Sequence, residues 1–121
     1  MNKDETTPYD QKVCDLSYLS TTMDGNKLLI NDIMKEFLIQ VPVELKCLST
    51  AIVETKYSKI KSYAHKMKST FSIMGISAVL PILNKLEELG ANENGFEEIK
   101  ELNNQLDKIA NQALKEIKEQ F

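Results

Sequence analysis

The chain has 121 residues, 42% of them hydrophobic and 27% charged, which is typical of one soluble domain with a substantial core. Its formal net charge is −3 and it contains no arginine, a composition that argues against nucleic-acid binding. No apolar run approaches the roughly 20 residues that cross a bilayer, and the N-terminus lacks the apolar stretch of a signal peptide, so we expect a cytoplasmic protein without membrane insertion.

The N-terminal part of the chain predicts a flexible segment and two helices. Residues 1–13 are mostly polar and are expected to be flexible. The residues that follow, 15–19, predict a short helix. A second helix, capped by Asp24 or Asn26, is predicted to run to about Gln40, because apolar residues recur there at intervals of three and four.

The middle of the chain predicts a third and a fourth helix. Pro42 suits the first turn of a helix and not its interior, so we expect the third helix to cover 42–55. The fourth helix is expected over 56–74. Gly75 suits the C-terminal turn of this helix, since glycine adopts the left-handed conformation found there.

The C-terminal part predicts a fifth helix over 77–89, ended by Gly90, and a sixth over 96–118. Pro81 lies either in the first turn of the fifth helix or at a bend within it. No segment alternates apolar and polar residues with a period of two, so no sheet is predicted. Short connections between helices favour antiparallel packing of neighbouring helices. We therefore predict an all-α domain over 14–121. Helices three to six form an up-and-down antiparallel four-helix bundle, and the first two helices cover one end.

The fourth predicted helix carries the only histidine, His65. At about 100° per residue, the apolar side chains of this helix share one arc of roughly a third of a turn. They are Ile60, Tyr63, Ala64, Met67, Phe71 and Met74. His65 points about 150° from the middle of that arc, and Lys61, Lys68, Ser69 and Ser72 share its side. We therefore expect His65 on the solvent side of a buried helix.

The lysines near His65 allow two interpretations. No acidic residue occurs between Glu54 and Glu87, whereas six lysines do. These lysines form either an ordinary solvated face or a positive field that attracts an acidic partner or a phosphoryl group.

The sequence around His65 resembles the phosphoacceptor helix of histidine-containing phosphotransfer (HPt) domains. That family has Ala-His, an apolar residue at +2, Lys at +3, Gly or Ser at +4, a small residue at +7, Gly or Ala at +10 and, about three turns further on, a Leu-Glu pair. The corresponding residues here are Ala64-His65, Met67, Lys68, Ser69, Ser72, Gly75 and Leu86-Glu87. Ser69 replaces the commoner glycine, which should narrow the approach of a partner only slightly.

The resemblance implies a phosphotransfer protein of a two-component phosphorelay. His65 would accept a phosphoryl group from an aspartate of a response-regulator receiver domain and pass it to another receiver, or act between a hybrid sensor histidine kinase and its regulator. The receiver would bring the magnesium. An imidazole is a suitable nucleophile near neutral pH, and Lys68, one turn on, can stabilise charge on the phosphoryl oxygens.

The sequence also limits this chemistry. It has no Gly-rich phosphate loop, so we expect a carrier without ATP binding or autokinase activity. Because the receiver would bring the magnesium, we expect no cofactor on this chain, and we expect a monomer. A receiver would dock on the face around His65, with apolar help from the segment that covers the end of the bundle. The expected docking residues are Lys61, Ser69, Ser72, Gly75, Leu16 and Leu19, although Gly75 is interpreted mainly as a helix stop.

Two other functions remain open. A helical docking module would bind receiver domains or other signalling proteins without phosphotransfer, and signalling that survives the loss of His65 would favour it. An enzyme that uses His65 as a general base lacks a second polar partner at suitable spacing. One histidine with Cys14 and Cys47 makes neither a metal site nor a disulfide framework, so we expect no metal and reduced cysteines.

Overall fold

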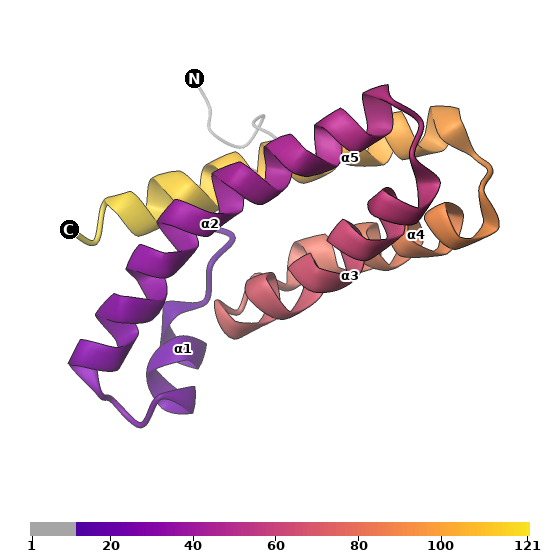
Figure 1. The fold of residues 1–121 in the computed structure, drawn as a ribbon. Helices are drawn as coiled ribbons and strands as arrows, with labels where there is room; N and C mark the ends of the chain where they lie inside the picture. The colour runs from indigo at the N-terminus through magenta and orange to yellow at the C-terminus, as the bar shows by residue number, and fades with distance from the viewer. Residues whose placement is uncertain (1–11) are drawn as a thin grey trace, which may run out of the picture.

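The structure, a computed structural model, describes residues 12–121, so the predicted flexible segment 1–13 lies almost wholly outside this part of the chain. Five α-helices pack together, and residues 12–121 contain no strand (Figure 1). They are α1 (Leu16–Thr22), α2 (Lys27–Val53), α3 (Tyr57–Ile73), α4 (Leu80–Asn92) and α5 (Phe96–Lys118), with a short 3₁₀ helix, η3 (Ser77–Val79), before α4. The prediction of an all-α domain is confirmed for these residues. None of the described helices is long and apolar enough to span a membrane.

The main departure from prediction is α2, which is one helix of 27 residues where two were expected. Pro42 lies inside it, although proline in a helix interior removes a hydrogen bond and costs about 3 kcal/mol. Its ring is exposed, while Val41 and Leu45 beside it are buried. Because the buried face of α2 continues on both sides of Pro42, burial of that face outweighs the local penalty and the helix runs through.

The ends of the helices resolve three expectations. Asn26 is the N-cap of α2, and its side-chain oxygen accepts the backbone N–H of Leu29 at 3.1 Å. Pro81 lies in the first turn of α4, so no bend is needed there. The prediction that Gly90 ends this helix is wrong. The helix continues past Gly90 to Asn92, and its C-cap residue, Glu93, adopts the left-handed conformation with φ +54°.

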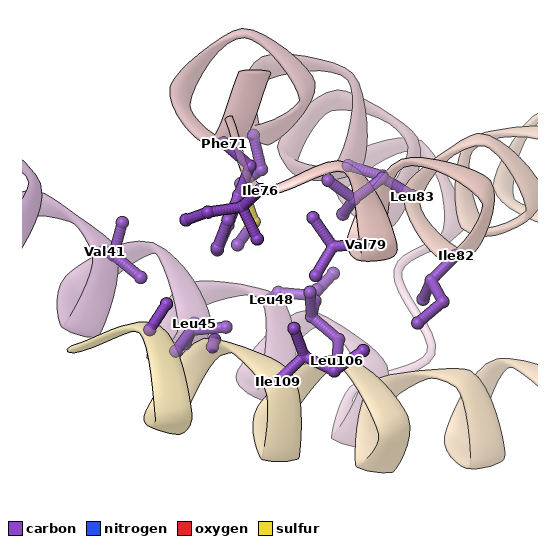
Figure 2. Packing of buried hydrophobic residues seen from close by; sticks show 14 of the residues in the cluster. Val41, Leu45, Leu48, Phe71, Ile76, Val79, Ile82, Leu83, Leu106 and Ile109 are labelled. Atoms are coloured by element: carbon purple, nitrogen blue, oxygen red, sulfur yellow. The ribbon is translucent and has the colours of Figure 1, made fainter. Parts of the chain in front are cut away.

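The core lies between α2, α3, α4 and α5, with η3 closing one side (Figure 2). The apolar arc predicted for α3 is confirmed, since five of its six residues are buried and Tyr63 is half-buried. Phe37 of α2 packs edge-on against Phe71 of α3, with ring centroids 5.3 Å apart. Helix α5 has the predicted bounds, and its buried apolar residues are Ile99, Leu106, Ile109, Ala110, Ala113 and Ile117. The solvent-facing side of α3 is therefore held in place by a packed apolar face behind it.

Glu116 of α5 is a buried carboxylate that anchors the segment before α1. It accepts the backbone N–H of Val13 at 2.7 Å and that of Cys14 at 2.9 Å, and the side chain of Gln112 donates to it at 2.8 Å. Burial by itself raises the pKa of Glu116, but these hydrogen bonds outweigh it and hold the pKa below its ordinary value. Burial and the neighbouring carboxylate raise the pKa of the Cys14 thiol to about 12, so this free thiol stays protonated.

Glu44 of α2 is buried without such partners. Neither of its carboxylate oxygens accepts a hydrogen bond from residues 12–121, and the Lys66 ammonium lies 3.7 Å from Oε2. Burial raises the pKa of Glu44 above its ordinary value, and the charge of Lys66 opposes this only partly. At pH values between the ordinary and the raised pKa, the folded chain therefore binds more protons than the unfolded chain. The free energy of unfolding accordingly falls as pH rises through that window.

We expect Glu44→Leu to raise the melting temperature at pH 7, because an apolar side chain of similar size removes a buried charge. The gain should shrink as pH falls toward 4, where the wild-type carboxyl group becomes neutral. Thermal unfolding followed by circular dichroism between pH 4 and 8 measures this difference. Glu36→Leu, at an exposed glutamate of the same helix, is the matched control and should lack the pH-dependent gain. A gain for Glu44→Leu that is equal at every pH would contradict the explanation.

Candidate functional site

Gly90 brings α3 and α4 into backbone contact. A Cβ atom on Gly90 would lie 2.9 Å from the backbone nitrogen of Lys61 and 3.0 Å from the carbonyl oxygen of Tyr57. Only glycine leaves enough space for this approach, which explains its place inside a helix that it was predicted to end. The two helices run antiparallel. The contact at Gly90 therefore also sets the distance between them one turn further along α3, where His65 faces Glu87.

His65 lies at the exposed rim of the α3–α4 pair. Its side chain is 69% exposed, in agreement with the predicted solvent-facing position. Its Nδ1 atom lies 2.9 Å from Oε2 of Glu87, while Nζ of Lys68 lies 2.6 Å from Oε1 of the same carboxylate. Lys68 also donates to the side-chain oxygen of Asn84 at 3.1 Å. One carboxylate thus connects the histidine to the lysine one turn beyond it.

This arrangement determines which nitrogen of His65 is available for reaction. The hydrogen bond from Lys68 is the main cause that lowers the pKa of Glu87; partial burial acts in the opposite sense, and the contact with His65 lowers the pKa further. An ionised carboxylate only accepts hydrogen bonds, so Nδ1 of a neutral imidazole must carry the proton that it shares with Glu87. The lone pair then lies on Nε2. No residue within 12–121 makes a hydrogen bond to that atom, and it is available to solvent or to a partner.

The other predicted site residues divide into two groups. Lys61, Ser69 and Ser72 are exposed along the same side of α3 as His65. Gly75 lies just beyond the helix with φ +68°, and a Cβ atom there would lie 2.8 Å from that of Asp15. Gly75 therefore ends the helix, as its main interpretation predicted, and the structure also packs it against the segment before α1.

The predicted docking residues of α1 need a correction. Leu19 is fully buried in the core and cannot contact a partner, while Leu16 is half-buried. Tyr18 is the exposed aromatic residue of this helix, and sequence reasoning missed it. The spacing of Leu16, Leu19 and Met23 by three and four residues identifies the buried face of α1, so the residues between them were the better candidates for contact.

A groove of about 300 Å³ lies between α1 and the end of α3. It is lined by Asp15, Tyr18, Ser72, Gly75, Ile76, Ser77 and Leu80. Because Ser72 lies two turns after His65 on the same helix, the groove adjoins the exposed histidine face. A protein that approaches His65 can therefore meet a shaped surface beside it.

Glu87 and Asn84 contact His65 and Lys68 only because the folded chain brings α4 against α3. Glu87 was noted as part of the Leu-Glu pair, but its hydrogen bond to His65 joins residues 22 positions apart. Only the antiparallel register of α3 and α4 would have identified Glu87 as a neighbour of His65. The close approach of the two helices in that register depends on Gly90. Within residues 12–121, no group of three or more histidine, cysteine, aspartate or glutamate side chains is arranged to hold a metal ion.

Comparison with known proteins identified no relative of this chain. No protein-family model, no curated protein and no solved structure matches it. A function is therefore argued from the residues of the site and their geometry.

We expect Gly90→Ala to destabilise the protein by about 1–3 kcal/mol, because the added methyl group meets backbone atoms of α3 that cannot move separately. The helices should separate, and the imidazole NMR signals of His65 should change as its contact with Glu87 lengthens. Urea unfolding and NMR measure the two effects. Asn92→Ala, at an exposed position of the same helix, is the control and should be nearly neutral. Unchanged stability of Gly90→Ala would exclude a tight contact between the two backbones.

Proposed function

We propose that this chain is a histidine phosphotransfer protein of a two-component phosphorelay. His65 accepts a phosphoryl group from the aspartyl phosphate of one receiver domain and passes it to the aspartate of another. The observation that carries this proposal is the exposed His65 held through Nδ1 by Glu87, with Lys68 bound to the same carboxylate. The arrangement leaves a nucleophilic nitrogen facing outward with a cation one turn away.

A four-helix bundle is part of the proposed HPt architecture. The C-terminal half of α2 joins α3, α4 and α5 in an up-and-down antiparallel bundle, and α1 with the first half of α2 covers one end. Two observations support this arrangement. Contacts follow a closed circuit in which α3 packs on α2 and α4, and α5 packs on the same two helices. The connections from α2 to α3 and from α4 to α5 are short, as antiparallel neighbours require.

In the proposed transfer, the Nε2 lone pair attacks the phosphorus atom of the aspartyl phosphate. The N–P bond forms, the P–O bond to the aspartate breaks, and its electron pair returns to the aspartate carboxylate. The imidazole ring keeps its Nδ1 proton and gains positive charge, which the Glu87 carboxylate at 2.9 Å stabilises. Onward transfer reverses these steps with the carboxylate of a second receiver, so the carrier is regenerated and needs no ATP.

Lys68 is suited to stabilise the phosphoryl group during transfer. Before reaction, its ammonium group is held by Glu87 and Asn84, so its position is defined and it is partly removed from water. A phosphoryl group on Nε2 brings negative oxygens within reach of a lysine one turn along the helix. The Lys68 ammonium group would then move from the Glu87 carboxylate to the phosphoryl oxygens and stabilise their negative charge.

The partner proposed for this surface is a receiver domain that brings its own aspartate and magnesium. The side of α3 around His65 combines small hydroxyl side chains with lysines and allows close approach of another protein. Lys61 and Lys68 favour an acidic partner site. The groove beside Tyr18 offers additional contact area at one edge of this surface.

We expect His65→Gln to abolish phosphoryl acceptance and to leave stability nearly unchanged, because the residue is exposed and a glutamine amide can still donate to Glu87. The assay mixes the protein with a labelled, phosphorylated receiver domain and magnesium. An acid-labile, alkali-stable label on the wild type alone is the expected result. Equal labelling of His65→Gln would exclude His65 as the acceptor. Receiver binding without label transfer from any of several receivers would favour the docking module instead.

We expect Lys68→Ala to slow transfer by about ten- to a hundredfold, or roughly 1.4 to 2.7 kcal/mol, if the ammonium stabilises the transition state. Rapid-quench measurements of single-turnover transfer give this rate. Asn84→Ala is the matched control, because it removes one anchor of Lys68 but keeps its charge, and it should slow transfer less. Equal rates for Lys68→Ala and the wild type would assign Lys68 a purely structural role.

A further inference from the structure

A groove of about 310 Å³ lies between the C-terminal half of α2 and the N-terminal half of α3. Along α2 its lining extends from Val43 to Glu54, which is about 16 Å at the rise of an α-helix. On α3 the lining includes Lys59 and Tyr63, one turn apart. The groove is therefore long for its volume, a shape that fits an extended chain better than a bulky ring system.

Most of the side chains that line the groove are apolar. Ala51 is buried, Cys47 and Tyr63 are half-buried, and Val43 at one end is 60% exposed. Small-molecule sites in proteins are typically cavities of about 300 Å³ or more with mostly apolar walls and a few polar groups. An apolar chain in this groove would remove the exposed parts of Val43 and Tyr63 from water, which favours binding.

The charged residues of the lining are Lys46 of α2, Lys59 of α3 and Glu54. Both lysines are exposed, and neither forms an ion pair with any residue in 12–121. Glu54, by contrast, lies 3.7 Å from the ammonium group of Lys56, which compensates part of its negative charge. The groove therefore combines an apolar surface with an excess of positive charge, one ammonium group coming from each helix.

We propose that this groove binds a medium-chain alkyl carboxylate. Its hydrocarbon chain lies along the apolar lining, and its carboxylate pairs with Lys46 and Lys59. Charge complementarity identifies an anion as the occupant, because a neutral or cationic amphiphile would leave both ammonium groups unpaired. Burial of the chain supplies most of the affinity, while ion pairs at exposed lysines add little. The dissociation constant is therefore expected to be about 0.1–1 mM.

The groove and the exposed histidine lie on opposite sides of α3. Tyr63 lines the groove, whereas His65 contacts Glu87 of α4. Two residues apart on a helix, the side chains of Tyr63 and His65 point about 160° away from each other. A bound carboxylate therefore leaves His65 open to another protein. This inference does not depend on the proposed phosphotransfer, and each can fail without the other.

Titration of the full chain with octanoate, followed by heteronuclear NMR, tests the site. Signals of the groove residues should shift and saturate, and those of His65 should not. Octanol has the same chain without the charge, and it should bind about fivefold more weakly because it cannot pair with the two lysines. Each methylene added between hexanoate and octanoate should tighten binding by up to about fourfold, as expected for a chain that is removed from water.

Lysine variants identify the contacts of the carboxylate. Lys46→Met and Lys59→Met keep the alkyl part of the side chain and remove its charge. Each should weaken octanoate binding about two- to fivefold and leave octanol binding unchanged. Lys108→Met, at an exposed lysine of α5, is the matched control and should change neither. Circular dichroism checks that each variant is folded.

Three results would overturn the proposal. The first is the absence of saturable shifts at the groove with about 10 mM octanoate. The second is octanol binding as tight as that of octanoate, which would identify an uncharged ligand. The third is octanoate binding that neither Lys46→Met nor Lys59→Met weakens more than Lys108→Met does.

Discussion

The backbone contact between α3 and α4 at Gly90 is the constraint on which the candidate site depends. It sets the separation of two helices that would otherwise be held apart by side chains. At that separation the Glu87 carboxylate reaches both His65 and Lys68. The geometry of the exposed imidazole therefore depends on a buried residue without a side chain.

The apolar core supports this contact from behind. Helix α3 presents one face to the core and the opposite face to solvent, so its orientation is determined by burial and its polar face carries the exposed His65. Helix α2 also contributes buried residues to this core along its length. It runs through Pro42 because core packing on both sides of the proline exceeds the cost of one missing hydrogen bond.

Three glutamate carboxylates have different surroundings in this fold, and their pKa values shift in different directions. Glu116 is buried with several donors and stays ionised, which anchors the segment before α1. Glu44 is buried with one distant lysine, and its raised pKa marks a local cost to stability. Glu87 lies at the surface between a lysine and a histidine, where its charge fixes the tautomer of the imidazole. The number and distance of the donors, more than burial alone, separate these outcomes.

The sequence by itself determined whatever depends on local periodicity and on single residues with special backbone preferences. The apolar arc of α3, the exposure of His65, the bounds of α5 and the stop at Gly75 are of this kind, because helical spacing and glycine conformation are properties of neighbouring residues. Only the tertiary structure decided the rest. The continuity of α2 and the burial of Leu19 follow from contacts between distant segments. The role of Gly90 and the hydrogen bond of Glu87 to His65 depend on how closely two helices approach, and a single helix carries no information on that distance.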